Sequence, residues 1–456
     1  MKRIMFFMTC LLLMGVVTAQ DTLRFSLEEA VEYALENNYT LKNSATDIEI
    51  AQKKIWETTS IGLPQVSIDA QYVNIFKVPK VSFPTTTLDN SIPDDAVITP
   101  EVLRNGLSLG FENGPEIALG VKENITANLV VSQLIFSSDY IVGLQAAKTF
   151  RLISEQSHLK NETDIKQLVY DSYHLVLVLT ETRNIVEGIL QNIISTEEEV
   201  RQMFEAGFME ESDVDQISLT RTTLENSTKL LFRQIDVAVK LLKFQMGLNL
   251  DQEIILTENL DLLIAGIDVE SLLAQQFILD ENIDYQIIST TEKVNELQLK
   301  LEKYRFLPTI SGFYQHQERA KKPDFDFMSP DMIGINLQLP LFTSGGRISK
   351  INQARLKLDQ IKNTKAQLVE GLAMDLTQSR SEFLNSLDSY NRQKQNVETS
   401  KRIYDRTLIK YREGFVSSLE LQTANNQYLQ AQQNYFQDML QLLNSKIKLN
   451  KILNTL

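Results

Sequence analysis

The ten prolines of the chain fall into two zones, and this distribution constrains the fold more than any other feature of the sequence. Proline lacks a backbone N–H and clashes with the preceding turn, so it is excluded from helix interiors. The proline-free tracts are rich in Leu, Gln, Lys, Glu and Asn at helical spacing, which predicts long helices. The zones themselves predict strands and loops, and their prolines are Pro64, Pro79, Pro84, Pro93, Pro100 and Pro115, then Pro308, Pro323, Pro330 and Pro340.

The start of the chain is typical of an export signal. Lys2 and Arg3 precede an almost wholly apolar run, and Ala19 ends a small-residue cleavage site, which predicts a signal peptide over residues 1–19. A membrane anchor is the alternative, but this run is shorter than the ~20 residues that a spanning helix needs. Lipidation of Cys10 is a second alternative, although apolar residues follow it directly. Cleavage removes the only cysteine and with it any disulfide.

The charge balance and the hydropathy pattern exclude several classes of protein. The formal net charge of −14 becomes −16 when Lys2 and Arg3 are removed, since −14 − 2 = −16, and such an acidic chain repels nucleic acid. No later stretch is long and apolar enough to predict a spanning helix. A mature protein that crosses a membrane must therefore do so as strands.

Within the proline zones the hydrophobic period changes to two. Ile333, Ile335 and Leu337, for example, alternate with Gly334 and Asn336. One apolar and one polar face suits a barrel between lipid and a wet lumen. A soluble sheet half covered by helices predicts the same alternation and remains open. The four predicted strands cover about 64–76, 122–135, 308–317 and 332–342.

The chain is also duplicated internally. The segment from Asn38 to Pro64 maps onto the segment from Asn282 to Pro308 at an offset of 244. Equivalent residues later in the two copies differ in number by only about 206, because the first copy has roughly 38 extra residues between Phe76 and Val121. We expect those residues to form a long loop at the strand tips. The first repeat covers residues 20–275, ending in a connecting segment, and the second covers 276–456.

Each repeat is predicted to contain one β-hairpin and one long helical hairpin, the latter over about 138–248 and 346–454. Gly207 and Gly414 suit helix ends at which φ turns positive. Ser212 with Asp215, and Ser417 with Glu420, suit the first turn of the returning helices.

These motifs together resemble the TolC-like outer-membrane efflux protein family. The resemblance covers nearly the whole mature chain, and the order and spacing of the motifs are more specific than any single one. The residues that carry it are Ser26-Leu27-Glu28-Glu29-Ala30, Asn37-Asn38, Leu63-Pro64-Gln65-Val66-Ser67, Leu339-Pro340-Leu341-Phe342-Thr343-Ser344-Gly345-Gly346-Arg347, Tyr411-Arg412-Glu413-Gly414-Phe415 and Leu419-Glu420-Leu421.

The resemblance implies a mainly α fold with a β-barrel contribution, in which a homotrimer forms a channel-tunnel through outer-membrane lipid with a long periplasmic portion. Each subunit gives four strands to a shared barrel and its coiled-coil helices to the tunnel. The implied function is passive exit in a tripartite efflux or type I secretion system. Substrates arrive from an inner-membrane RND or ABC pump through a periplasmic adaptor (membrane fusion) protein.

The family's helical tips dock the adaptor, so the resemblance makes Gly207, Phe208, Gly414 and Phe415 the candidates for that contact. A purely structural interpretation remains beside it. In that interpretation the glycines end helices and the phenylalanines cover the core of each hairpin.

The family also places acidic residues beyond the tip glycine, at the closed end of the tunnel. Asp213, Asp215 and Glu420 hold that place here, and threefold symmetry would gather them into rings that favour cations. The alternative is that they only complement helix dipoles. Tyr411 is a candidate hydrogen-bond latch between helices, although its counterpart Phe204 has no hydroxyl.

The sequence holds no catalytic or cofactor motif. It lacks a phosphate-binding loop, an HExxH motif and a GxSxG elbow. Its three histidines, His158, His174 and His316, have no metal-ligand spacing. We therefore expect no enzyme, metal or cofactor. An exported periplasmic coiled-coil scaffold without a channel is the alternative function.

Overall fold

The computed structural model describes residues 23–90, 95, 97, 99–322 and 329–456, so the predicted signal peptide lies outside the described residues. The chain divides into two compact units. Unit 1 comprises residues 1–52, 149–295 and 356–456, and unit 2 comprises 53–148 and 296–355. Each unit contains segments from both halves of the sequence.

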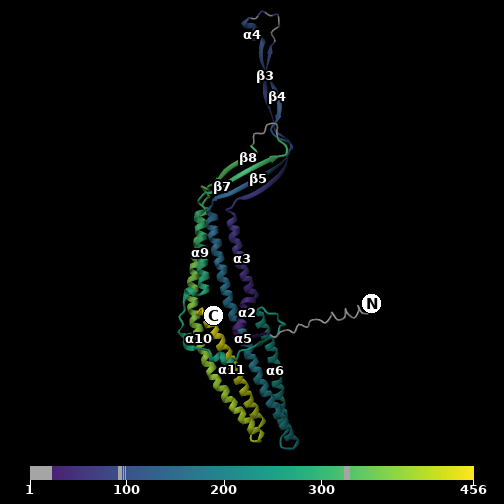
Figure 1. The fold of residues 1–456 in the computed structure, drawn as a ribbon, viewed down its shortest axis with the longest axis vertical. Coiled ribbons are helices and arrows are strands. Elements are labelled where there is room, and N and C mark those ends of the chain that lie inside the picture. The colour runs from purple at the N-terminus through teal and green to yellow at the C-terminus, as the bar shows by residue number, and fades with distance from the viewer. Residues whose placement is uncertain (1–22, 91–94, 96, 98, 323–328) are drawn as a thin grey trace, which may run out of the picture. The chain divides into compact units, whose positions relative to one another are not determined.

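The described chain is mainly helical (Figure 1). Its helices are α2 (Leu27–Asn37), α3 (Tyr39–Ser60), α4 (Pro100–Gly106), α5 (Ser138–Glu205), α6 (Glu211–Met246), α7 (Leu260–Ala265), α8 (Val269–Ala274), the 3-10 helix η2 (Leu279–Glu281), α9 (Ile283–Tyr304), α10 (Gly346–Arg412) and α11 (Ser418–Ile452). Its strands are β1 (Leu23–Phe25), β2 (Gln65–Asn74), β3 (Lys80–Asn90), β4 (Leu107–Ala118), β5 (Glu123–Phe136), β6 (Ile254–Leu256), β7 (Thr309–Arg319) and β8 (Asp331–Gln338).

The duplication is visible in the helices that open each repeat. Helices α3 and α9 both have 22 residues, and their first and last residues are related by the same offset of 244 that the sequence predicts. The side chain of Asn38 accepts a hydrogen bond from the N–H of Thr40 at 2.7 Å, and Asn282 accepts one from Asp284 at 3.1 Å. Both helices thus begin with the same asparagine cap.

The long helical hairpins match in length as well. Helix α5 has 68 residues and α10 has 67, while the returning helices α6 and α11 have 36 and 35. Figure 1 shows α6 folded back along α5 and α11 folded back along α10. No helix within the described ranges is long and apolar enough to cross a membrane.

The four predicted strands form one antiparallel sheet in the order β2-β5-β7-β8. One row of the register runs through Val66, Val131, Tyr314 and Ile333, so apolar side chains from all four strands share a face. The pairing of β5 with β7 joins the hairpins of the two repeats. Strand β8 ends at Gln338, two residues before Pro340, which has no N–H to donate.

The extra residues of the first repeat do not form the long loop that the sequence predicted. Strands β3 and β4 pair there as an antiparallel ribbon, with α4 preceding β4 (Figure 1). The register shifts between Ser82 and Pro84, so the proline lies at an irregularity of the ladder. Proline in this segment is therefore compatible with a strand, which is why its presence was misleading.

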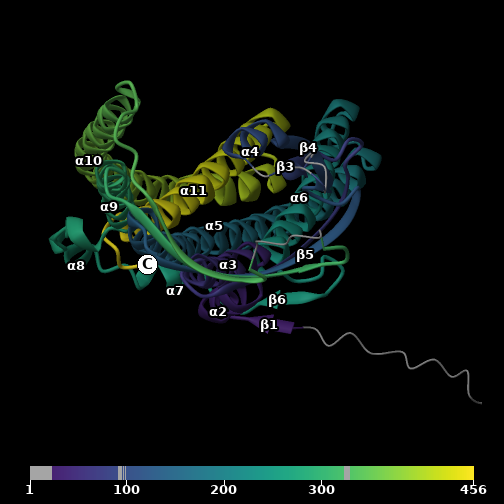
Figure 2. The same cartoon turned by 90° about the horizontal axis from the view of Figure 1, so that it is seen from above.

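Three buried clusters hold the helices of unit 1 together. The first joins α2, α5 and α6 around Tyr173 and Leu242, both fully buried. The second joins α5, α10 and α11 around Phe383 and Leu442, and the third lies between the ends of the long hairpins around Ile193. Helices α6 and α11 also contact each other directly, and the top view of Figure 2 shows α5, α6 and α11 together.

His174 and Asp171 on α5 both have pKa values that their surroundings shift; His174 is buried and Asp171 is half-buried. Burial lowers the pKa of His174 to about 4, although its hydrogen bond to Asn444 opposes the shift. Burial also raises the pKa of Asp171 to about 6, against the effects of Gln167 and Lys451. The Oδ1 atom of Asp171 has no hydrogen-bond partner in the part of the chain that the structure describes.

We expect Asp171→Asn to stabilise the protein at pH 7.5. The pKa of the Asp171 carboxyl is about 6 in the folded protein and 3.8 in the unfolded chain, so folding favours the protonated form. The stability that this form contributes is fully present below pH 3.8 and is lost as the pH rises through about 6. The asparagine variant should gain about 1 to 2 kcal/mol at pH 7.5, allowing for solvent screening, and nothing at pH 3.5. Chemical unfolding at both pH values measures this difference. Asp236→Asn, the same change at an exposed residue of α6, is the matched control.

Candidate functional site at the helical tips

The two long hairpins end in turns of the same geometry. Gly207 and Gly414 have φ values of 80° and 75°. The N–H of Phe208 donates to the carbonyl of Met203 at 2.8 Å, and the N–H of Phe415 donates to that of Lys410 at the same distance. The left-handed glycine that the sequence predicted is therefore present in both turns, where it satisfies the last carbonyls of α5 and α10.

The phenylalanines after these glycines point to solvent. Phe208 is 84% exposed and Phe415 is 79% exposed. The next residues, Met209 and Val416, pack against the buried cluster instead. In the described chain the phenylalanines therefore do not cover the hairpin cores, and each tip presents a large apolar side chain.

The starts of the returning helices differ from each other. Helix α6 begins after Glu210, whose side chain and that of Asp213 cap each other's backbone N–H groups. The prediction that Ser212 and Asp215 start this helix is wrong, because the extended backbone of Glu210 already begins the first turn. Helix α11 begins as predicted, with the N–H of Glu420 donating to the Ser417 hydroxyl at 3.3 Å.

Near the tips, the first hairpin is joined to the second by a hydrogen bond and an ion pair. The Ser418 hydroxyl donates to Oδ1 of Asp213 at 2.6 Å, linking the first turns of α11 and α6. Nε of Arg412 lies 2.9 Å from Oε2 of Glu199, linking α10 to α5. Neither contact was predicted, since no sequence pattern pairs these positions. Ser418 is buried and Asp213 is half-buried, so their charge-assisted hydrogen bond is partly shielded from water.

Tyr411 is 1% exposed and packs in the cluster that contains Val214 and Leu421. Its hydroxyl has no hydrogen-bond partner among the described residues, so the predicted latch does not form. Burial raises the pKa of Tyr411 to about 12, and the charge of Asp213 adds to the effect. Tyr411 is thus a core residue, and the negative charge of Asp213 acts on its hydroxyl.

The predicted acidic residues lie at the first turns of the returning helices. Asp213 reaches α11 through Ser418, and Glu420 is two residues further along that helix. Asp215 and Glu420 are exposed. Among the described residues no group of three acidic, histidine or cysteine side chains has the geometry of a metal site. A carboxylate ring would require further copies of the chain and stays a prediction.

Replacement of Tyr411 by phenylalanine tests whether its hydroxyl contributes to stability. Because the hydroxyl is buried without a partner, Tyr411→Phe should leave the free energy of unfolding unchanged or raise it by up to about 1 kcal/mol. The matched control is Tyr173→Phe, whose hydroxyl donates to the Phe25 carbonyl at 2.9 Å. That variant should lose about 1 to 2 kcal/mol in chemical unfolding. A comparable loss of unfolding free energy in Tyr411→Phe would support the predicted hydrogen-bond latch instead.

The fold has close counterparts among solved structures. A CusC structure has a TM-score of 0.71 at 13% identity, covering 94% of this chain and 91% of that one. The outer membrane protein VceC of Vibrio cholerae has a TM-score of 0.68 at 15% identity, covering 94% and 95%. The Campylobacter jejuni CmeC outer membrane channel has a TM-score of 0.69 at 17% identity, covering 94% and 85%.

The sequence comparisons match one part of the chain to a family model. No curated protein sequence matches the chain significantly. The family model described as outer membrane efflux protein matches residues 293–455, which include the second β-hairpin and the second helical hairpin. This description agrees with the outer-membrane localisation that the sequence predicted. Family match and fold together confirm that the chain resembles the TolC-like outer-membrane efflux proteins.

Proposed function

We propose that three copies of this chain form a channel-tunnel through the outer membrane, which gives substrates a passive exit. The observation that carries the proposal is a four-stranded sheet that is open at both edges and apolar on an exposed face. Each copy would contribute its sheet to a common barrel and its long helices to a periplasmic tunnel.

The edges of the sheet favour closure with further copies. In the described chain β2 and β8 each pair on one side only. Unpaired backbone groups in hydrocarbon cost several kcal/mol each, so an isolated sheet cannot lie in a membrane. Pairing of β8 with β2 of the next copy would remove every edge.

The two faces of the sheet differ as a barrel wall requires. Side chains on the apolar face are exposed in the single chain, as Ile68 at 73%, Ile333 at 84% and Ile335 at 74% illustrate. The other face is polar, and Nε2 of Gln317 there donates to Oδ1 of Asn128 at 2.9 Å. Lipid would cover the first face and a wet lumen would meet the second.

Helix α6 carries an apolar seam that supports assembly of the tunnel. Val237, Leu241 and Phe244 follow one another at intervals of four and three residues and are 66%, 44% and 65% exposed. This heptad spacing is typical of a helix that packs against another helix. We propose that the seam packs against a helix of a neighbouring copy.

The tips would dock the hairpin of a periplasmic adaptor through Gly207, Phe208, Gly414 and Phe415. An inner-membrane RND or ABC pump would supply the energy, because an open duct has none of its own. The alternative, an exported periplasmic coiled-coil scaffold, accounts for the helices but not for an exposed apolar sheet face.

Reconstitution into planar lipid bilayers tests the channel and its acidic rings. Wild type should conduct and prefer cations, and the double variant Asp213→Asn with Glu420→Gln should lose most of that preference and of its block by divalent cations. Asp236→Asn, an exposed change elsewhere on α6, is the matched control. Unchanged selectivity in the double variant would exclude the rings. Recovery of the wild-type protein from periplasm without detergent would exclude the channel.

Replacing the phenylalanines at the tips of the helical hairpins by aspartate tests adaptor docking. Phe208→Asp and Phe415→Asp place a carboxylate where an apolar contact is proposed, so both should abolish efflux in cells while single-channel conductance stays normal. Phe83→Asp, a change at an exposed phenylalanine on β3, should leave efflux intact. Normal efflux in both tip variants would contradict docking at these residues.

A further inference from the structure

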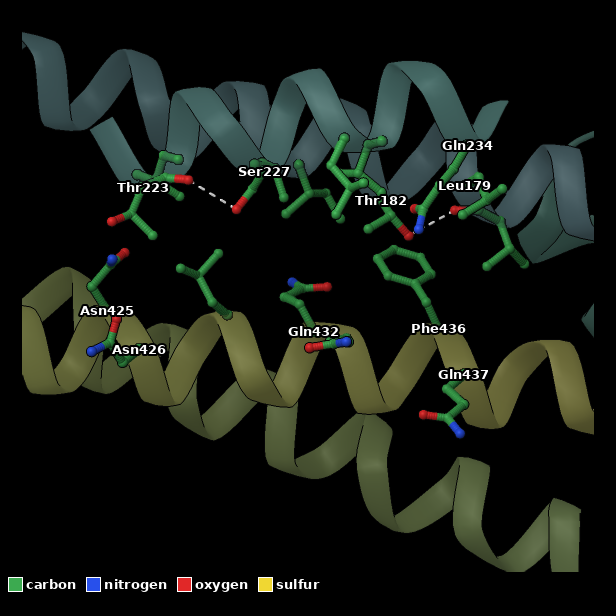
Figure 3. A pocket seen from close by; sticks show the side chains of 18 of the residues that line it. Leu179, Thr182, Thr223, Ser227, Gln234, Asn425, Asn426, Gln432, Phe436 and Gln437 are labelled. Atoms are coloured by element: carbon green, nitrogen blue, oxygen red, sulfur yellow. Dashed lines mark hydrogen bonds between the residues drawn. The ribbon is translucent and has the colours of Figure 1, made fainter. Parts of the chain in front are cut away.

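A cavity of about 560 Å³ lies in unit 1 between α5 and α6 on one side and α11 on the other (Figure 3). Its volume falls within the ~300 to 1,000 Å³ of typical small-molecule sites. The predicted adaptor tips and acidic gate residues are not among the residues that line it. The cavity is therefore separate from the site described above.

The lining combines apolar and polar side chains but carries no charge. Leu179, Leu230 and Phe436 supply aliphatic and aromatic surface, and Thr223, Ser227 and Gln234 supply hydroxyl and amide groups. Among the described residues that line the cavity there is no Asp, Glu, Lys, Arg or His. This is unusual in a chain in which 23% of the residues are charged.

Two amides of α11 leave hydrogen-bonding groups unused in this cavity. Asn425 is 1% exposed, and neither its side-chain oxygen nor its nitrogen has a hydrogen-bond partner among the described residues. Gln432 is 8% exposed; its Nε2 donates to the Tyr428 hydroxyl at 2.9 Å, but its Oε1 has no partner. Figure 3 shows both amides facing the space between the helices, as Phe436 does. Buried polar atoms without partners are costly, so a molecule that paired with them would be favoured.

We propose that this cavity binds an uncharged amphipathic small molecule. Its apolar or aromatic body would lie against Leu179, Leu230 and Phe436, and its donor or acceptor groups would meet Asn425 and Gln432. A charged molecule would lose its hydration without gaining a counter-charge, so the site selects against ions. The site is complete in one chain, and the inference stands apart from the proposed channel.

The test is a fluorescence titration of the full-length protein in lipid nanodiscs, with empty nanodiscs as the blank. The probe is N-phenyl-1-naphthylamine, a neutral aromatic amine whose N–H can donate to Gln432. Thr223→Phe fills the cavity from an exposed position. Thr222→Phe is the matched control, because both threonines donate to a carbonyl four residues back but only Thr223 lines the cavity.

Wild type and Thr222→Phe should bind the neutral probe saturably, and Thr223→Phe should bind it at least tenfold more weakly while keeping its unfolding midpoint and its conductance. The second arm uses 8-anilinonaphthalene-1-sulfonate, which has a related ring system with an added negative charge and should bind at least tenfold more weakly than the neutral probe. Equal binding of the neutral probe by the two variants would overturn the site. Equal binding of both probes to wild type would overturn its selection against charge. Because conductance is measured separately, its absence would contradict the channel without affecting the binding result.

Discussion

Backbone hydrogen bonding at the sheet edges is the constraint on which the proposed assembly depends. Four strands pair with one another in the single chain, and β2 and β8 each retain one side without a strand partner among the described residues. Water tolerates such edges, but hydrocarbon does not. If the apolar face meets lipid, the edges must be paired by other copies.

The duplication shows which dimensions the molecule keeps equal. Helices α3 and α9 have the same length, and the long hairpins agree to within one residue. Two hairpins that end in the same glycine turn present Phe208 and Phe415 in the same way. The β3–β4 ribbon has no counterpart among the described residues of the second β-hairpin, so differences between this protein and its relatives in fold are best sought there.

Polar groups inside the helical hairpins serve different purposes according to their partners. Ser418 and Asp213 satisfy each other and join the two hairpins. The hydroxyl of Tyr411 and the amide of Asn425 have no partner, yet they lie in different surroundings, one in a packed cluster and one beside a cavity. The unpaired hydroxyl of Tyr411 lowers the stability of the packed cluster, whereas the unpaired amide of Asn425 lies where a ligand can bind.

The sequence by itself determined the repeat, the four strands of the main sheet, the long helices and the positive φ of both tip glycines. These features depend on local rules: proline excludes helix, alternation of period two builds strands, and glycine tolerates a left-handed backbone. Only the tertiary structure decided that the loop is a ribbon, that α6 starts directly after Glu210, and that Tyr411 is buried without a hydrogen bond among the described residues. It alone brought Asn425 and Gln432 to one uncharged cavity, because contacts between helices distant in sequence depend on how their faces pack.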